Sequence, residues 1–195
     1  MLILRIIAWM VIDKPREQRN FNLSLEFRLR ANNMKPGTHE IEFKGDLLNR
    51  GFWLYVWEIT TPEKTHVYYV GRTGDSSSMN AQSPFNRMSQ HLSFNEKQNM
   101  LRRHLDNKHI IVEMCNFRLI AYGPILEQAT IREAHVKSRD TIAAIEKQLA
   151  KSLTDSGYEV LNTVNCKKSV DPLLWNKVRQ AFAKHFPNIK GIGSA

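Results

Sequence analysis

The chain has 195 residues, which suits one domain with extensions and is enough to bury a substantial core. Its 28 Lys and Arg residues outnumber its 19 Asp and Glu residues, giving a formal net charge of +9 and a pI of about 9.7. This charge favours a polyanionic partner, of which nucleic acid is the most economical, although many basic proteins bind no DNA. Two cysteines, Cys115 and Cys166, cannot by themselves form a disulfide framework or a four-ligand zinc site, and they are compatible with a cytoplasmic location.

Residues 2–12 are apolar apart from Arg5. The run is too short to span a membrane, and it lacks the charged start and cleavage site of a signal peptide. We therefore expect a structural extension, or an upstream start with Met10 as the alternative initiator. We expect no membrane partner.

Residues 20–31 alternate strictly between polar and apolar side chains, which predicts a strand with one buried face. Turn-forming residues follow at 32–37, and Ile41 and Phe43 then alternate with charged residues. This pattern predicts an N-terminal β-hairpin before the core. The hairpin pairs with the core sheet or serves as a separate binding flap, and the sequence does not choose between them.

The core is predicted to begin with two strands, 52–59 and 66–72, joined by a turn at residues 61–63. Ser83 and Pro84 are typical of a helix N-cap and first helical position, so a helix is predicted from there to about residue 92. A second helix is predicted over about 95–106. A third strand is predicted over 109–122, ended by Gly123-Pro124.

Helical periodicity then extends over about 125–153, with a break favoured near Ser138-Arg139. Gly157 is the predicted helix stop. Asp171-Pro172 predicts the start of a last helix.

Short motifs lie in the predicted strands and in the helix that follows them. Trp53-Leu54-Tyr55 lies in the first strand, and Tyr69-Val70-Gly71 ends the second. Arg87 and His91 stand four residues apart in the predicted helix, so they project from one face.

Two later residues complete the pattern: Glu146 in the long helix and Asn162 after the turn that follows it. In this order the set resembles the GIY-YIG nuclease family over residues 51–164, with the first tripeptide in place of GIY and the second in place of YIG. The resemblance implies an α/β (α+β) fold: a small, mainly antiparallel sheet flanked by helices, with the N-terminal hairpin and C-terminal helix added. The expected division is an extension at 1–50, the nuclease core at 51–165 and a basic helix and tail at 166–195.

The resemblance implies a divalent-metal-dependent endonuclease in which Glu146 binds the metal. A carboxylate is a hard oxygen donor and suits Mg²⁺ or Mn²⁺, which relieves phosphate charge and assists the departing oxygen. The alternative is that Glu146 is a solvated helix charge paired with Lys147.

The resemblance also assigns roles to five other residues. Tyr55 deprotonates or orients the attacking water, and acting as a base requires a lowered pKa. Tyr69 helps to position that water. Arg87 holds the scissile phosphate and His91 binds phosphate or relays a proton, while Asn162 pins the active-site turn. The alternative is structural: aromatic residues that pack the sheet, a surface arginine and an ordinary turn asparagine.

Two features depart from the family pattern. The first tripeptide lacks its glycine, and a Ser-rich insertion at 75–83 lengthens the gap before Arg87. Arg72 is therefore a competitor for the position of the catalytic arginine. Gly71 is expected to let the chain turn sharply beside the substrate.

Basic residues outside the motifs are expected to contact phosphates without reading sequence. The nucleic-acid-binding candidates are Arg72, Lys97, Arg102, Arg103, Lys167, Lys168 and Lys177. The C-terminal helix is alternatively, or additionally, a docking helix with Leu174, Val178 and Phe182 on the core. The expected partner is double-stranded DNA, with an RNA-directed nuclease and a catalytically silent binding module of the same fold as alternatives. One active site per chain implies single-strand cuts, and a homodimer through the hairpin edge is one route to a double-strand break.

Overall fold

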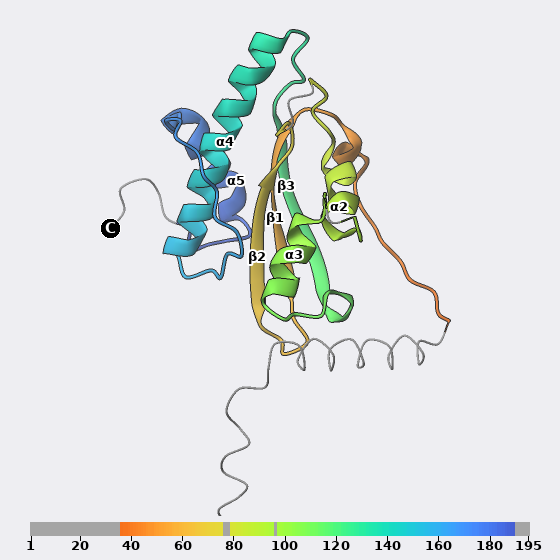
Figure 1. Ribbon diagram of the computed structural model, residues 1–195. Helices are drawn as coiled ribbons and strands as arrows, with labels where there is room; N and C mark the ends of the chain where they lie inside the picture. Colours follow the sequence, from red (N-terminus) through yellow and green to blue (C-terminus); the bar gives the residue numbers. More distant parts are fainter. Residues whose placement is uncertain (1–35, 76–78, 96, 190–195) are drawn as a thin grey trace, which may run out of the picture. The chain divides into compact units, whose positions relative to one another are not determined.

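The computed structural model describes residues 36–75, 79–95 and 97–189. The chain divides into two compact units, residues 1–42 and 43–195. The helices and strands described below belong to the second unit, which has an α+β fold with a three-stranded antiparallel sheet and four α-helices in its described part (Figure 1).

The sheet has the strand order β2-β1-β3. The central strand β1 (Phe52–Thr60) pairs on one side with β2 (His66–Arg72) and on the other with β3 (Asn116–Leu126), antiparallel in both cases. Because β1 is central and covered on both faces, nearly all of its residues are buried, which explains its almost continuous apolar sequence. The predicted strands at 52–59 and 66–72 are confirmed.

Helices cover both faces of the sheet. The helices α2 (Pro84–Leu92) and α3 (Met100–Asn107) lie on one face, and α4 (Arg132–Asp155) and α5 (Pro172–Ala183) lie on the other (Figure 1). Two 3-10 helices, η2 (Gly45–Leu48) and η3 (Val112–Met114), complete the regular structure.

Alternate residues of β1 and β2 enter two separate cores. On the α4 and α5 side, Leu54, Tyr68 and Val70 pack with the apolar stripe of α4 and with α5. On the α2 and α3 side, Tyr55 and Tyr69 pack with residues of α3. Tyr68 and Tyr69 therefore point to opposite faces, as period-two geometry predicts.

The predicted helix caps are confirmed. Ser83 Oγ accepts a hydrogen bond from Asn86 N, with Pro84 at the first helical position. Asp171 Oδ1 accepts from the backbone N–H groups of residues 173 and 174 at the start of α5. Gly157, with φ of 87°, follows the end of α4.

The third strand differs from its prediction. Residues 112–114 form η3, and β3 begins at Asn116 and continues through Gly123-Pro124 to Leu126. Because β3 is an edge strand, a proline without an N–H donor is tolerated there. The glycine is required as well: a Cβ on Gly123 (φ 153°) would lie 2.7 Å from Trp53 Cδ2.

Two helices also differ from their predictions. α3 starts at Met100 rather than near residue 95, and α4 starts at Arg132 rather than 125. α4 is continuous through Ser138-Arg139, where a break was predicted. Its buried face begins with His135, before the predicted break, and a polar residue gives no sign of this in the apolar pattern.

The first arm of the predicted hairpin, residues 20–31, lies outside the described residues. The second arm is not a strand, since residues 36–44 form neither helix nor strand. Ile41 is 79% exposed, so the alternating polar and apolar residues at this point do not form a buried strand face. Phe43 instead stacks on Phe85 of α2, with ring centroids 4.8 Å apart.

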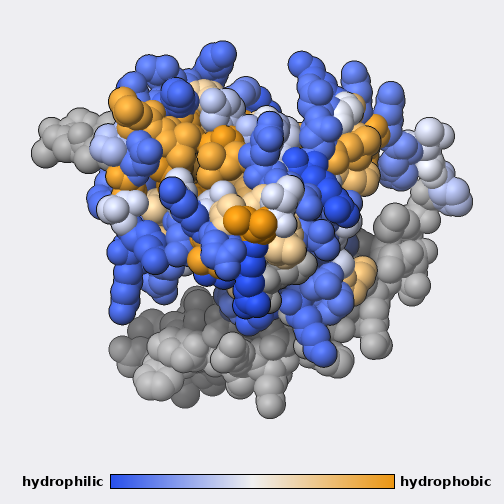
Figure 2. Space-filling model, turned by 90° about the horizontal axis from the view of Figure 1, so that it is seen from above, coloured by the Kyte–Doolittle hydropathy of each residue, from blue (hydrophilic) through white to orange (hydrophobic). Residues whose placement is uncertain are grey.

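The docking prediction for the last helix is confirmed, since α5 buries Val178 and Phe182 and leaves Lys177 exposed. Seen from above, the surface is mainly hydrophilic, with hydrophobic patches between the polar side chains (Figure 2). Among the helices of the described ranges, none combines the length and apolarity needed to cross a bilayer.

Candidate active site

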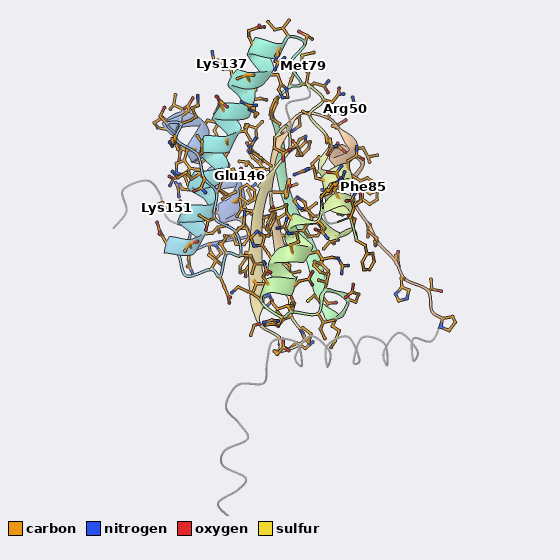
Figure 3. All side chains as sticks on the ribbon, viewed as in Figure 1. Arg50, Met79, Phe85, Lys137, Glu146 and Lys151 are labelled. Atoms are coloured by element: carbon orange, nitrogen blue, oxygen red, sulfur yellow. The ribbon has the colours of Figure 1, made fainter. Side chains whose placement is uncertain are left out.

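The motif residues lie near β2, at one edge of the sheet. Tyr55 comes from β1, Tyr69 and Arg72 from β2, and Arg87 and His91 from α2. The two later members of the set, Glu146 of α4 and Asn162 of the segment after it, reach β2 by direct hydrogen bonds. Glu146 lies where α4 faces β2, whereas Lys151 lies on the outer side of the helix (Figure 3).

Gly71 is required by the ring of Tyr55. The two residues are direct partners in the β1–β2 register. A Cβ on Gly71 would lie 2.4 Å from Tyr55 Cε2 and 2.6 Å from its hydroxyl oxygen. The expected reason, a sharp turn of the chain, is therefore wrong: Gly71 lies within the strand and provides the space for the phenol ring.

The hydroxyl of Tyr55 contacts His91. Tyr55 Oη lies 2.6 Å from His91 Nε2 and 3.3 Å from the carbonyl oxygen of Arg72. The ring of His91 also packs edge-on against the ring of Tyr69, with centroids 5.1 Å apart. Both tyrosines and the histidine are buried, so they form one closely packed aromatic group.

Burial controls the protonation of this group. It raises the pKa of Tyr55 and of Tyr69 well above the usual tyrosine range, and the charge of Arg87 only partly opposes this. Burial, with the nearby Arg87 charge, lowers the pKa of His91 to about 3. At neutral pH Tyr55 is therefore a protonated phenol beside an uncharged imidazole.

A neutral imidazole has one donor nitrogen and one acceptor nitrogen. If Tyr55 donates its hydroxyl proton to Nε2, the imidazole proton is on Nδ1, which is buried and has no hydrogen-bond partner among the described residues. In this arrangement the lone pairs of the phenol oxygen remain available as acceptors.

Asn162 holds the open edge of β2. The segment after α4 pairs with the edge strand through Tyr68, whose N–H donates to Glu159 O and whose carbonyl accepts from Leu161 N. Asn162 then continues this pairing with its side chain: Oδ1 accepts from Val70 N at 2.9 Å, and Nδ2 donates to Val70 O at 2.8 Å. The amide thus acts like a strand peptide group and fixes the tripeptide Tyr69-Val70-Gly71.

Glu146 forms an ion pair with Arg72. Arg72 Nε donates to Glu146 Oε2 at 2.8 Å, and both side chains are largely buried. Burial raises the pKa of Glu146 to about 7, although Arg72 opposes the shift. Glu146 is therefore not a solvated surface charge, and Lys147 binds Cys166 O instead of pairing with it.

Arg87 is held in place by two acceptors. Its Nη2 donates to Asp75 Oδ2 at 2.9 Å and its Nη1 to Gln90 Oε1 at 3.1 Å. Its Nε, like Nη1 of Arg72, is buried without an acceptor among the described residues. Both competitors for the role of catalytic arginine therefore lie in the site, each with a buried nitrogen that has no acceptor among the described residues.

The described residues around Glu146 provide few metal ligands. No cluster of three or more His, Cys, Asp or Glu side chains suited to a metal occurs in the described ranges. Mg²⁺, however, is often bound by one or two carboxylates together with water and substrate phosphates. A single buried carboxylate whose charge is only partly compensated, Glu146, fits that manner of binding.

The remaining nucleic-acid-binding candidates are divided between the two helical layers. Lys97 and Arg103 are exposed on the α3 side, whereas Arg102 is largely buried and engaged with Glu113. The C-terminal candidates Lys167, Lys168 and Lys177 are exposed on the α4 and α5 side, and Lys168 forms an ion pair with Asp140 at 2.9 Å. They do not form one continuous track with α3.

Two residues of the site escaped the sequence analysis. Asp75 belongs to the Ser-rich insertion, yet it binds Arg87. His104 of α3 packs on Tyr69, with ring centroids 5.7 Å apart. Helical spacing was the available signal for His104, since it lies three residues after Leu101, a buried residue of the same face.

Comparison with models of protein families, with curated proteins and with solved structures finds no match for this chain.

We predict that Gly71→Ala displaces the Tyr55 ring, because the added methyl group overlaps it. The free energy of unfolding should fall by about 1–3 kcal/mol, the usual cost of overpacking a core. Urea denaturation measures this change. Gly45→Ala is the control, because its added Cβ meets no atom within 4 Å. Equal stability of the two variants would contradict the close packing of Tyr55 on Gly71.

We predict that His91 stays neutral from about pH 8 to about pH 4.5, since its pKa in the fold is about 3. In ¹H–¹³C NMR spectra its ring signals, assigned by their loss in His91→Gln, should not shift over this range. An ordinary titration near pH 6.5 would contradict the buried pair with Tyr55.

The same shift has a defined effect on stability. Below about pH 6.5 unfolded His91 takes up a proton and the folded residue does not. The free energy of unfolding therefore decreases as the pH falls from about 6.5 toward 3. Glu146 acts in the opposite direction: its pKa is raised from 4.5 to about 7, so the fold gains stability from it as the pH falls between these values.

Proposed function

We propose that this protein is a divalent-metal-dependent endonuclease that hydrolyses phosphodiester bonds of DNA through a single active site of the GIY-YIG type. The observation that supports it most is the convergence of Tyr55, Tyr69, Arg87, His91 and Glu146, with Asn162 bonded to the strand that carries Tyr69. These residues lie in five separate segments of the chain. The family pattern concerns only the order of these residues along the chain. Their proximity in the fold is an additional observation.

Phosphate recognition is the part of this function that the two arginines support. Arg72 and Arg87 each have a buried N–H without an acceptor among the described residues. Leaving such a donor unpaired costs about 1–3 kcal/mol, and a phosphate oxygen would remove this cost. Guanidinium groups held in advance by Glu146 and Asp75 bind the charge that develops on a phosphoryl group without reorganising.

Water positioning is assigned to Tyr55. Because burial raises the pKa of this phenol, it orients the attacking water as a neutral hydrogen-bond acceptor and does not remove its proton. In the tautomer in which His91 Nε2 accepts the Tyr55 hydroxyl proton, a lone pair of the phenol oxygen stays available to the water. The water oxygen then attacks the phosphorus, the bond from phosphorus to the departing oxygen breaks, and the proton lost by the water passes through solvent to that oxygen.

Glu146 would hold Mg²⁺ or Mn²⁺, which supplies charge relief at the phosphate and help for the departing oxygen. The ion pair with Arg72 keeps the carboxylate oriented toward β2. Arg72 therefore acts on both the metal ligand and, through its unused N–H, the phosphate.

Nicking of supercoiled plasmid with Mg²⁺ or Mn²⁺, run beside a structured RNA, tests the proposal. Cleavage of the plasmid supports it. Cleavage of the RNA alone would replace it with an RNA-directed nuclease, and binding without any cleavage would leave a silent binding module. Nicked circles are expected before linear product, since the chain has one such site.

We predict that Glu146→Gln lowers plasmid cleavage by at least about 100-fold, because an amide replaces a hard anionic ligand poorly. DNA binding in EDTA should stay near that of the original protein, since the amide oxygen still accepts from Arg72. Glu133→Gln makes the same chemical change at an exposed position of α4 and should cleave normally. Full activity of Glu146→Gln would refute the metal assignment.

We predict that Arg87→Ala lowers the cleavage rate about 100-fold more than it weakens DNA binding, because its contact strengthens as charge develops. Arg72→Ala should in addition reduce the free energy of unfolding by about 1–3 kcal/mol, since it leaves the buried Glu146 without its partner. Single-turnover cleavage, binding in EDTA and urea denaturation measure these effects. An inactive Arg72→Ala beside an active Arg87→Ala would exchange the roles of the two arginines.

A further inference from the structure

Helix α3 and the segment before it line a cavity of about 640 Å³ that the proposed chemistry does not use. Its lining residues are Phe94, Asn99, Arg102, Arg103 and Asp106. The last four occupy positions i, i+3, i+4 and i+7, so they lie along one face of the helix. The other face, with Leu101 and Leu105, is buried in the core that contains Tyr55 and Tyr69.

Phe94 gives this cavity a stacking surface. Phe94 is 77% exposed, so much of its ring is open to solvent. The guanidinium of Arg102 lies 4.3 Å from the ring centroid. Arg102 is itself fixed, since Nε donates to Leu92 O at 3.1 Å and Nη1 to Glu113 Oε1 at 2.7 Å. The ring is thus backed by a held cation and presents open area to a flat, electron-rich group.

Asn99 gives the cavity an unmet hydrogen-bond requirement. Asn99 is only 4% exposed, and its Oδ1 is buried without a partner in the described part of the chain. Buried amide oxygens are normally paired, and the amino or imino group of a nucleobase would supply the donor. The Asp106 carboxylate on the same face also accepts N–H groups and repels phosphate, whereas the exposed Arg103 attracts phosphate.

A nucleotide matches all of these features: a flat base for Phe94, N–H donors for Asn99 and Asp106, and a phosphate for Arg103. A volume of about 640 Å³ is also in the range of pockets that hold small molecules. A base within an intact duplex cannot enter such a pocket, because both of its faces are stacked and its pairing edge is used.

We propose that this α3 pocket binds one unpaired nucleotide of the DNA substrate, so that the protein prefers bulged, branched or overhanging DNA to perfect duplex. The inference rests on the proposed function and specifies its substrate class. The pocket and the active site share helix α3, since His104 packs on Tyr69 from that helix. The bound nucleotide therefore lies close to the scissile phosphate.

The test is binding by the full chain in EDTA, which keeps it independent of cleavage. The probes are a duplex with 2-aminopurine in a one-nucleotide bulge, the matched duplex with 2-aminopurine paired, and free 2-aminopurine nucleotide. We expect the bulged duplex to bind about tenfold tighter than the paired one, with a fluorescence change caused by stacking on Phe94. The free nucleotide should bind far more weakly than the bulged duplex, because it lacks the flanking phosphate contacts.

Phe94→Ala should abolish the tenfold preference, and Phe94→Trp should keep it, because a larger aromatic ring still stacks. Phe94 is exposed, so these changes should leave the fold intact. The matched control is Leu173→Ala, an 80% exposed apolar residue on the other side of the sheet, which should keep the preference.

Equal binding of bulged and paired duplex, or an unchanged preference in Phe94→Ala, would overturn the inference. Equally tight binding of the free nucleotide would also overturn it, in favour of a mononucleotide site unrelated to DNA structure. A normal preference for the bulge together with an uncleaved plasmid would refute the proposed function alone.

Discussion

Tyr55 reaches His91 because the strand beside it carries glycine at position 71. With any side chain there, the phenol ring would be pushed out of the space it occupies, since a Cβ would lie 2.4 Å from it. The hydroxyl would then lose its 2.6 Å contact with His91, and the ring of Tyr69 would lose its packing partner. Asn162 secures the same point from the open edge of β2 by pairing with both backbone groups of Val70. The outer edge of β2 is thereby hydrogen-bonded at Tyr68 and Val70 and not left open to another strand.

Charged side chains of the site are largely buried, whereas on an ordinary surface they are exposed to water. Arg72 and Glu146 are paired in a largely buried position, and burial still raises the pKa of Glu146 to about 7. Arg87 lowers the pKa of His91 further and is itself anchored to Asp75. Buried ion pairs are weak contributors to stability, because the desolvation penalty offsets much of the attraction. Their effect here is to hold two guanidinium groups in fixed positions, as the proposed phosphate recognition requires.

The sequence predicted the parts of this fold that local physics determines. The cap at Ser83 and the cap at Asp171 follow from side chains that bond their own helix, and the first two strands follow from apolar runs bounded by turn residues. The start of β3 was mispredicted, because the apolar residues 110–112 resemble a strand while forming the entry to a 3-10 helix.

Long-range contacts explain the other differences. Asp75 could not be recognised as a partner of Arg87, because the pairing depends on how the insertion folds back and not on residue spacing. The reason for Gly71 was mistaken in the same way: the sequence shows a glycine, but only the strand register shows that Tyr55 lies opposite it. Contacts of this kind depend on tertiary structure, which periodicity does not contain.

Helix α3 contributes to both the core beneath the tyrosines and the cavity beside Phe94. Leu101 and Leu105 are fully buried in the core beneath the tyrosines, so the position of the helix relative to the active site is set by packing and not by a loop. The cavity on the other face of α3 therefore lies at a fixed distance from Tyr69. In the proposed function, a nucleotide held by Phe94 would present the neighbouring phosphates to the arginines at a fixed spacing. The place of the cut would then be measured from an unpaired base, and basic side chains that attract phosphates without reading sequence would suffice elsewhere.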